Sequence, residues 1–178
     1  YPNIGIVSSR EEATFHDILL GMLRGLDWLA AQPYADKTDF TYWGGSQGGA
    51  FGIALTALWG NFRKTFAYVP AITDVFAEDL GRHGPWPNAL KAYRKPLEVE
   101  ALRKHWPYLD TCNFAARVKT PIRVMVGLAD MACPPPGVYA AYNRIPAQDK
   151  AIYPIVGMPH SGPPAAYNLK LRTWLTER

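Results

Sequence analysis

The first part of the chain carries one clear helical pattern. Its apolar residues recur every three or four positions and would share one face of a helix: Phe15, Ile18, Leu19, Met22, Leu23, Leu26 and Leu29. Ser9 and Glu12 have the spacing of a capping box just before this stretch, and Pro33 ends it. The pattern predicts a single amphipathic helix.

Short apolar runs then alternate with helical stretches. We predict strands over residues 40–43, 65–69, 121–127 and 150–156, which are rich in aromatic and β-branched residues and end at Gly or Pro. Helices are predicted over residues 50–59, 138–145 and 165–175. This alternation indicates an α/β fold, with a mostly parallel sheet covered by helices on both faces.

Residues 71–117 break the alternation. Prolines and tryptophans interrupt short helical stretches there, among them Pro85, Trp86, Pro87, Pro96, Trp106 and Pro107. We interpret this segment as an insertion or cap on the sheet. Because the chain shows no internal repeat and no linker, we expect residues 1–178 to form a single domain.

Composition narrows the class of protein. With 178 residues, 48% hydrophobic and 19% charged, the chain can bury a core and is not expected to be disordered. The net charge is +4, but no run of five basic residues occurs, so we do not expect a nucleic-acid partner. No apolar run reaches the roughly 18 residues of a membrane span. The chain begins at Tyr1 without a methionine, which leaves a leader sequence and the localisation open.

The two cysteines, Cys112 and Cys133, do not predict a metal site. They form neither a CxxC pair nor a cluster with histidines along the sequence. Their spacing does not decide whether they form a disulfide. We therefore do not expect a structural metal.

A candidate catalytic motif occurs at Gly44-Gly45-Ser46-Gln47-Gly48. This G-x-S-x-G pattern falls where a predicted strand meets a predicted buried helix, the place where a nucleophilic serine sits on a strained turn. The Gln47 backbone N–H, at the start of the helix, would face a developing oxyanion. The alternative is a glycine-rich helix start in which Ser46 is only an N-cap.

A nucleophilic serine needs a base and an acid, and in this kind of fold they follow it as acid and then histidine. His160 alone follows the last predicted strand, whereas His16, His83 and His105 come too early. Asp130 lies just past a predicted strand and so at the carboxyl edge of the sheet, while Asp149 lies at the opposite edge. Weaker candidates for the acid are Asp74, Glu78 and Asp79. Asp130 could instead be a turn or cap aspartate, and His160 a solvated loop residue.

Longer motifs resemble a known family. The sequence around Ser46 continues to Gly49, Asp130 is followed by Cys133-Pro134-Pro135, and residues 113–117 read Asn-Phe-Ala-Ala-Arg. From about Thr14 onward the chain resembles the acetyl xylan esterases and cephalosporin C deacetylases of carbohydrate esterase family 7. The resemblance implies a Ser46, Asp130 and His160 triad, a small acyl pocket, no cofactor, and a closed homo-oligomer, commonly a hexamer.

Two departures from the family accompany this resemblance. Members often have His-Glu at the catalytic histidine, where this chain has His160-Ser161. The family's sheet has about twice the four strands predicted here, so the N-terminal half of the sheet is expected to be absent from this sequence, together with the loop that gives the second oxyanion N–H. We accordingly expect the 178 residues alone to be weakly active or inactive.

Three functions follow from this reading. The first is a serine esterase that removes acetyl groups from xylo-oligosaccharides or similar small acetylated compounds. The second is a general carboxylesterase or peptidase on the same scaffold. The third is an inactive member that keeps the fold for binding or assembly.

Overall fold

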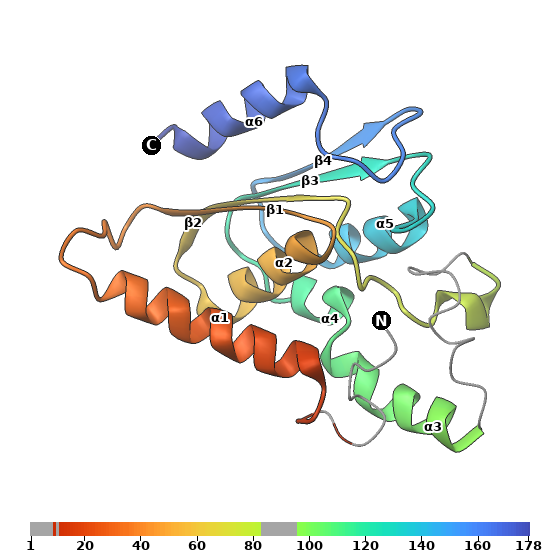
Figure 1. Ribbon diagram of the computed structural model, residues 1–178. Coiled ribbons are helices and arrows are strands. Elements are labelled where there is room, and N and C mark those ends of the chain that lie inside the picture. Colours follow the sequence, from red (N-terminus) through yellow and green to blue (C-terminus); the bar gives the residue numbers. More distant parts are fainter. Residues whose placement is uncertain (1–8, 10, 83–95) are drawn as a thin grey trace.

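The computed structural model describes residue 9, residues 11–82 and residues 96–178, and its parallel sheet is the centre of the fold (Figure 1). The strands are β1 (Phe40–Gly45), β2 (Phe62–Tyr68), β3 (Ile122–Gly127) and β4 (Lys150–Ile155). Within the described residues they form one parallel sheet in the order β1-β2-β3-β4, so β1 and β4 are its edge strands. All four carboxyl ends therefore lie at one edge.

Helices cover both faces of the sheet, as predicted. Figure 1 shows on one face α1 (Thr14–Ala30), α2 (Gln47–Trp59), α4 (Thr111–Ala115) and α5 (Pro135–Arg144). The other face is covered by α6 (Ala165–Thr176), whose Leu171 and Leu175 pack with Phe66 and Met125 of the sheet. The resulting three-layer arrangement confirms the α/β prediction.

The nearly all-apolar sequence of α2 is explained by its position. The helix lies between the sheet and its neighbours, with Ala50 and Leu55 packed towards α1 and Ile53 packed against β3 and α5. A helix that is buried on all sides needs no polar face. It starts at Gln47, three residues before the predicted start, because the glycines that suggested a turn already lie in the helix.

The start of α1 also differs from the prediction. The Ser9 hydroxyl accepts a hydrogen bond from the Glu12 backbone N–H at 3.1 Å, but α1 begins only at Thr14, with Ala13 as its N-cap residue. The expected capping box is therefore wrong as a helix cap, because its bond closes a turn before the helix. The apolar face of α1 is as predicted, with Phe15 and Leu19 buried.

The segment interpreted as an insertion or cap is mostly helical where it is described. It contains two short 3₁₀ helices, η1 (Ala77–Leu80) and η3 (Trp106–Tyr108), and the helices α3 (Pro96–His105) and α4. Buried Cys112 and Ala115 of α4 pack in the same core as β3. The interpretation of residues 71–117 as a cap stays a prediction, and Pro85, Trp86 and Pro87 lie outside the described residues.

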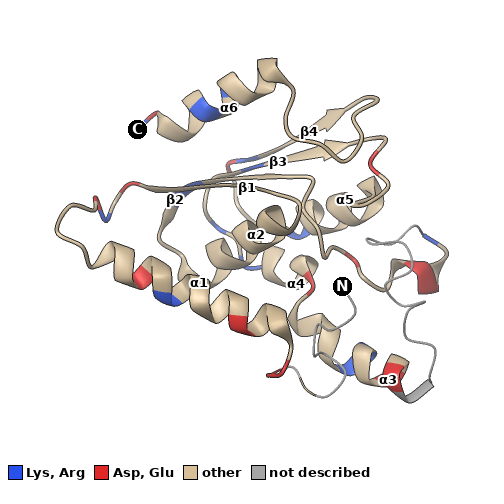
Figure 2. Cartoon of the chain, in the orientation of Figure 1, with Lys and Arg blue, Asp and Glu red and all other residues tan. Residues whose placement is uncertain are grey.

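Charged residues are spread over helices and loops, and α1 carries both signs (Figure 2). Asp17, Arg24 and Asp27 all belong to α1. In the part of the chain that the structure describes, no helix combines the length and apolarity that a bilayer span requires.

Candidate active site

Ser46 occupies a sharp turn between β1 and α2. Its backbone has φ 54° and ψ −120°, a conformation that residues with a Cβ adopt only at a cost of about 1–3 kcal/mol. Backbone hydrogen bonds hold it there: its N–H donates to the Tyr68 carbonyl at 3.0 Å, and its carbonyl accepts from the Ala71 N–H at 2.9 Å. A strained serine at the carboxyl end of a parallel strand is the geometry that projects an Oγ above the sheet.

Gly44 is required by the tightness of this turn. A Cβ at position 44 would lie 2.6 Å from the Gly48 carbonyl oxygen, which is backbone and cannot step aside. Gly48 itself is under no such constraint, because a Cβ there would meet only the Tyr42 hydroxyl at 4.0 Å. Of the two flanking glycines of the motif, the first is therefore the one that sterics demands.

His160 reaches Ser46 from the loop between β4 and α6. Its Nε2 lies 3.0 Å from Ser46 Oγ, and its side chain is 35% exposed. The loop is docked on the end of β3, where the Met158 carbonyl accepts from the Ala129 N–H at 3.1 Å. Gly127 permits this approach, since a Cβ at that position would stand 2.4 Å from the Met158 carbonyl oxygen.

Asp130 lies behind the histidine, in the turn after β3, with a fully buried side chain. Its Oδ2 accepts from His160 Nδ1 at 2.8 Å, and its Oδ1 accepts from the backbone N–H groups of Ala132 and Cys133, both at 2.8 Å. One oxygen therefore closes the turn while the other accepts from the imidazole.

The three side chains form one hydrogen-bonded chain with a defined proton order. A carboxylate can only accept, so Asp130 fixes the proton of His160 on Nδ1 and leaves Nε2 as the acceptor for the Ser46 hydroxyl. His160 Nε2 is thus left to accept the hydrogen of the Ser46 hydroxyl. Gln47 is the first residue of α2, where backbone N–H groups have no acceptor within the helix.

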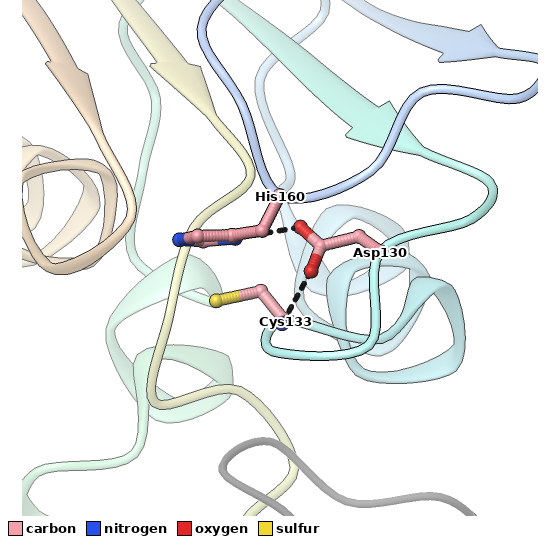
Figure 3. A group of neighbouring side chains, drawn as sticks. All are labelled: Asp130, Cys133 and His160. Atoms are coloured by element: carbon pink, nitrogen blue, oxygen red, sulfur yellow. Dashed lines mark hydrogen bonds and ion pairs between the residues drawn. The ribbon is translucent and has the colours of Figure 1, made fainter.

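Cys133 lies beside Asp130 and His160 (Figure 3) and was not anticipated as a site residue. Ligand atoms of Asp130, Cys133 and His160 lie within 4.8 Å of one another. Burial and the Asp130 charge raise the pKa of the Cys133 thiol to about 12, with a Ser46 hydrogen bond acting in the opposite direction. Asp130 and His160 are hydrogen-bonded to each other and the Cys133 thiol is protonated, so these three groups do not favour a bound metal ion.

The rival residues lie elsewhere. Asp74 pairs with Arg82 and Asp79 with Arg103, each at 2.6 Å, and Glu78 belongs to η1. Asp149 pairs with Arg123 before β4 begins, at the opposite edge of the sheet. His16 belongs to α1 and His105 ends α3, while His83 lies outside the described residues.

The cysteines are both free and buried, so the disulfide that the sequence left undecided is not formed. Burial together with the Asp110 charge also raises the pKa of the Cys112 thiol well above its ordinary value. Both thiols are therefore neutral.

The sheet, its helical layers and the strained serine turn define an α/β-hydrolase fold, which solved α/β-hydrolase structures share. The family model for acetyl xylan esterase (AXE1) matches residues 3–178. The chain belongs to the acetyl xylan esterase family, as its motifs predicted.

Individual relatives agree with this membership. Acetyl esterase Axe7A of Xylanibacter ruminicola is 30% identical over 148 residues, which are 82% of this chain and 33% of that protein. The acetyl xylan esterase from Paenibacillus sp. R4 superposes with a TM-score of 0.83 at 21% identity, covering 94% of this chain and 54% of that one. Acetyl xylan esterase 1 from Thermoanaerobacterium sp. JW/SL YS485 gives 0.78 at 28% identity, covering 93% and 54%. The chain thus spans a third to about half of the length of these relatives.

Proposed function

We propose that the protein is a serine esterase that hydrolyses acetyl esters of xylo-oligosaccharides or similar small acetylated compounds. The observation that carries the proposal is the hydrogen-bonded chain from Ser46 Oγ through His160 to Asp130. Family membership and the names of the matched relatives support the acetyl specificity and the carbohydrate-type substrate.

In the proposed reaction His160 Nε2 takes the Ser46 proton while the hydroxyl oxygen attacks the acetyl carbonyl carbon. Asp130 keeps the imidazole in the tautomer that accepts this proton and stabilises the imidazolium that forms. The imidazolium then gives the proton to the leaving sugar hydroxyl. Water, deprotonated by the same imidazole, attacks the acetyl-serine; the bond from the acyl carbon to Ser46 Oγ breaks, the imidazolium returns the proton to that oxygen, and acetate leaves, so the cycle uses no cofactor.

Gln47 is the proposed oxyanion donor. Its backbone N–H sits at the N-terminus of α2, where the helix dipole favours negative charge, and directly follows the nucleophile. A donor in this position stabilises the tetrahedral intermediate more than the flat ester. It therefore lowers the barrier without tightening substrate binding.

The test is acetate release by the natural full-length protein and its Ser46→Ala variant. We expect hydrolysis of p-nitrophenyl acetate and of acetylated xylo-oligosaccharides, with kcat falling on the order of 10⁶-fold in the variant because the nucleophile is gone. The matched control is Ser9→Ala, which removes a serine hydroxyl ahead of α1 whose bond goes to the Glu12 N–H, and which should leave kcat unchanged.

The butyrate ester separates the proposal from its main rival. A small acyl pocket rejects p-nitrophenyl butyrate, whereas a general carboxylesterase accepts it. Equal rates on both esters would replace the acetylesterase by a general esterase. Activity that survives Ser46→Ala would remove the triad assignment itself, and no activity in the unmodified protein would leave a fold kept for binding or assembly.

A further inference from the structure

The loop after β2 runs beside the nucleophile in a conformation that is costly for its sequence. Within residues 69–75, called here the 69–75 loop, Val69 has φ 39°, Ile72 has φ 55° and Asp74 has φ 51°. Positive φ is a genuine outlier for β-branched residues such as Val and Ile. Such a loop keeps its shape only when contacts with the surrounding structure hold it in place.

Hydrogen bonds join this loop to the backbone of Ser46. The Ala71 N–H donates to the Ser46 carbonyl at 2.9 Å, and the Val69 N–H donates to the Met125 carbonyl at 2.8 Å. On its far side the loop is held by Thr111, whose N–H donates to the Ile72 carbonyl at 2.7 Å and whose Oγ1 donates to the Ala71 carbonyl at 3.0 Å. Ala71 thus links the strained serine turn to the start of α4.

Asp110 also holds the 69–75 loop; its hydrogen bonds to the loop, together with those of Thr111, are called here the clamp. Its Oδ1 accepts from the backbone N–H of Asp74 at 3.2 Å and of Cys112 at 2.8 Å, and its Oδ2 accepts from the Val75 N–H at 3.0 Å. Asp110 is 8% exposed, which is rare for an unpaired carboxylate and requires that its oxygens be hydrogen-bonded. The bond to Cys112 caps α4, and the other two bonds go to the loop.

We infer that Asp110 is a positioning residue for the nucleophile, acting through the 69–75 loop on the backbone of Ser46. The inference rests on the proposed esterase function. Capping α4 needs one acceptor, which a serine would supply, whereas holding the N–H groups of Asp74 and Val75 needs both carboxylate oxygens. A purely capping role does not explain the two bonds to the N–H groups of Asp74 and Val75.

Substitutions can separate the clamp function of Asp110 from its function as a helix cap. Asp110→Ser keeps one acceptor for the Cys112 N–H and loses the bonds to the loop. Asp110→Asn keeps the shape but presents an amide N–H₂ where Oδ2 accepted from Val75. A third variant, Thr111→Val, leaves Asp110 intact and removes only the side-chain bond to the Ala71 carbonyl.

The measurement is kcat and KM for p-nitrophenyl acetate in the natural full-length protein, with the unfolding temperature alongside. We expect Asp110→Ser to lower kcat about 10–100-fold with KM within about twofold, because a displaced Ser46 Oγ loses its attack geometry. Asp110→Asn and Thr111→Val should lower kcat in the same direction by less. The midpoint of the pH–rate profile should not move, since the His160–Asp130 pair is untouched.

The stability control is Val118→Ala. Val118 is fully buried between α4 and β3 and packs in one core with Cys112, so Val118→Ala lowers stability but removes none of the hydrogen bonds from Asp110 or Thr111 to the loop. Asp110→Ser with kcat within twofold of the unmodified protein, or a fall matched by Val118→Ala, would overturn the inference and leave a helix cap. If Asp110→Ser does not fold, unchanged kcat in both Asp110→Asn and Thr111→Val overturns it. Absence of activity in the unmodified protein would instead be a failure of the proposed function.

Discussion

Asp130 shows how one side chain satisfies two demands. Its Oδ1 closes the turn after β3 through two backbone N–H groups, and its Oδ2 orients His160. In the proposed mechanism the turn bonds fix the carboxylate before any substrate binds, so the imidazole needs no further ordering when the reaction begins. This preorganisation is what makes a hydrogen-bonded triad effective.

The thiols next to this carboxylate and next to Asp110 are predicted to be inert in the folded protein. Cys133 and Cys112 are buried and protonated because burial raises both pKa values, and the thiolate is the reactive form. We expect iodoacetamide at pH 8 to leave both positions unmodified in the native state and to alkylate both in denaturant, as mapped by peptide mass spectrometry. Rapid native labelling of Cys133 would contradict the assignment of a neutral, shielded thiol.

At this scale the sequence predicted which residues come together, but not all of their neighbours. Chain order and the carboxyl-edge rule were enough to select Asp130 over Asp149 and His160 over His16, because strand direction fixes the edge at which each loop lies. The sequence did not predict the positions of Cys133 and Asp110 beside these residues, because those positions depend on backbone turns. The φ values of the loop beside Ser46 have no signature in Val69, Ile72 or Asp74, none of which favours a left-handed backbone as glycine does.

Among the elements, the end of β3 and the loop that carries His160 are fitted to each other through Gly127. A methyl group at position 127 would lie 2.4 Å from the Met158 carbonyl oxygen and 3.0 Å from that of Pro159, so the loop would have to move. We expect Gly127→Ala to lower kcat on the order of 10²-fold, since a shift of about 1 Å in the base has that effect. Steady-state kinetics on p-nitrophenyl acetate measures it.

Gly21→Ala is the matched control for that substitution. Gly21 lies within α1, and a Cβ there would meet no atom within 4 Å. The change should leave kcat unaltered and raise the free energy of unfolding by about 0.5–1 kcal/mol, because Ala is the better helix former. A Gly127→Ala protein with unaltered kcat would show that the histidine loop tolerates the displacement.

Helix α6 is the element whose docking the sequence could not reveal. It carries no basic residue in its last turn, yet its terminal carbonyls are satisfied from β2. Arg63 Nη2 donates to the Leu175 carbonyl at 2.7 Å, and Lys64 Nζ donates to the carbonyls of Trp174 and Glu177 at 2.6 and 2.8 Å. Periodicity predicts that a helix exists there, but it does not show which distant cationic side chains donate to the carbonyls at its end.

At the scale of the whole molecule, these bonds hold the layer above the sheet. We expect Lys64→Met to lower the free energy of unfolding by about 1–3 kcal/mol, since it deletes charged hydrogen bonds to helix-terminal carbonyls while keeping an apolar stem. Urea unfolding of the variant against the exposed Lys119→Ala control measures the loss. Equal stabilities of the two variants would show that α6 is held by its apolar contacts alone.

The fold class was predictable because its signals are local. Each strand is a compact apolar run, and the alternation with helices leaves few topologies. The strand boundaries were less predictable. β2 begins at Phe62 rather than residue 65, because the charged side chains of Arg63 and Lys64 conceal a strand; these side chains are half-buried and bind the end of α6. The homo-oligomer implied by the resemblance stays a prediction.

Ser46, Asp130 and His160 follow one another along the chain, and this order sets when each group becomes available during synthesis. A chain emerging from the ribosome presents Ser46 after β1 and Asp130 after β3, and receives His160 only once β4 has been added. A nascent chain that ends before residue 160 therefore holds a serine with no base to activate it. In the proposed mechanism the enzyme is therefore inactive during its own translation, until the loop between β4 and α6 packs against the sheet.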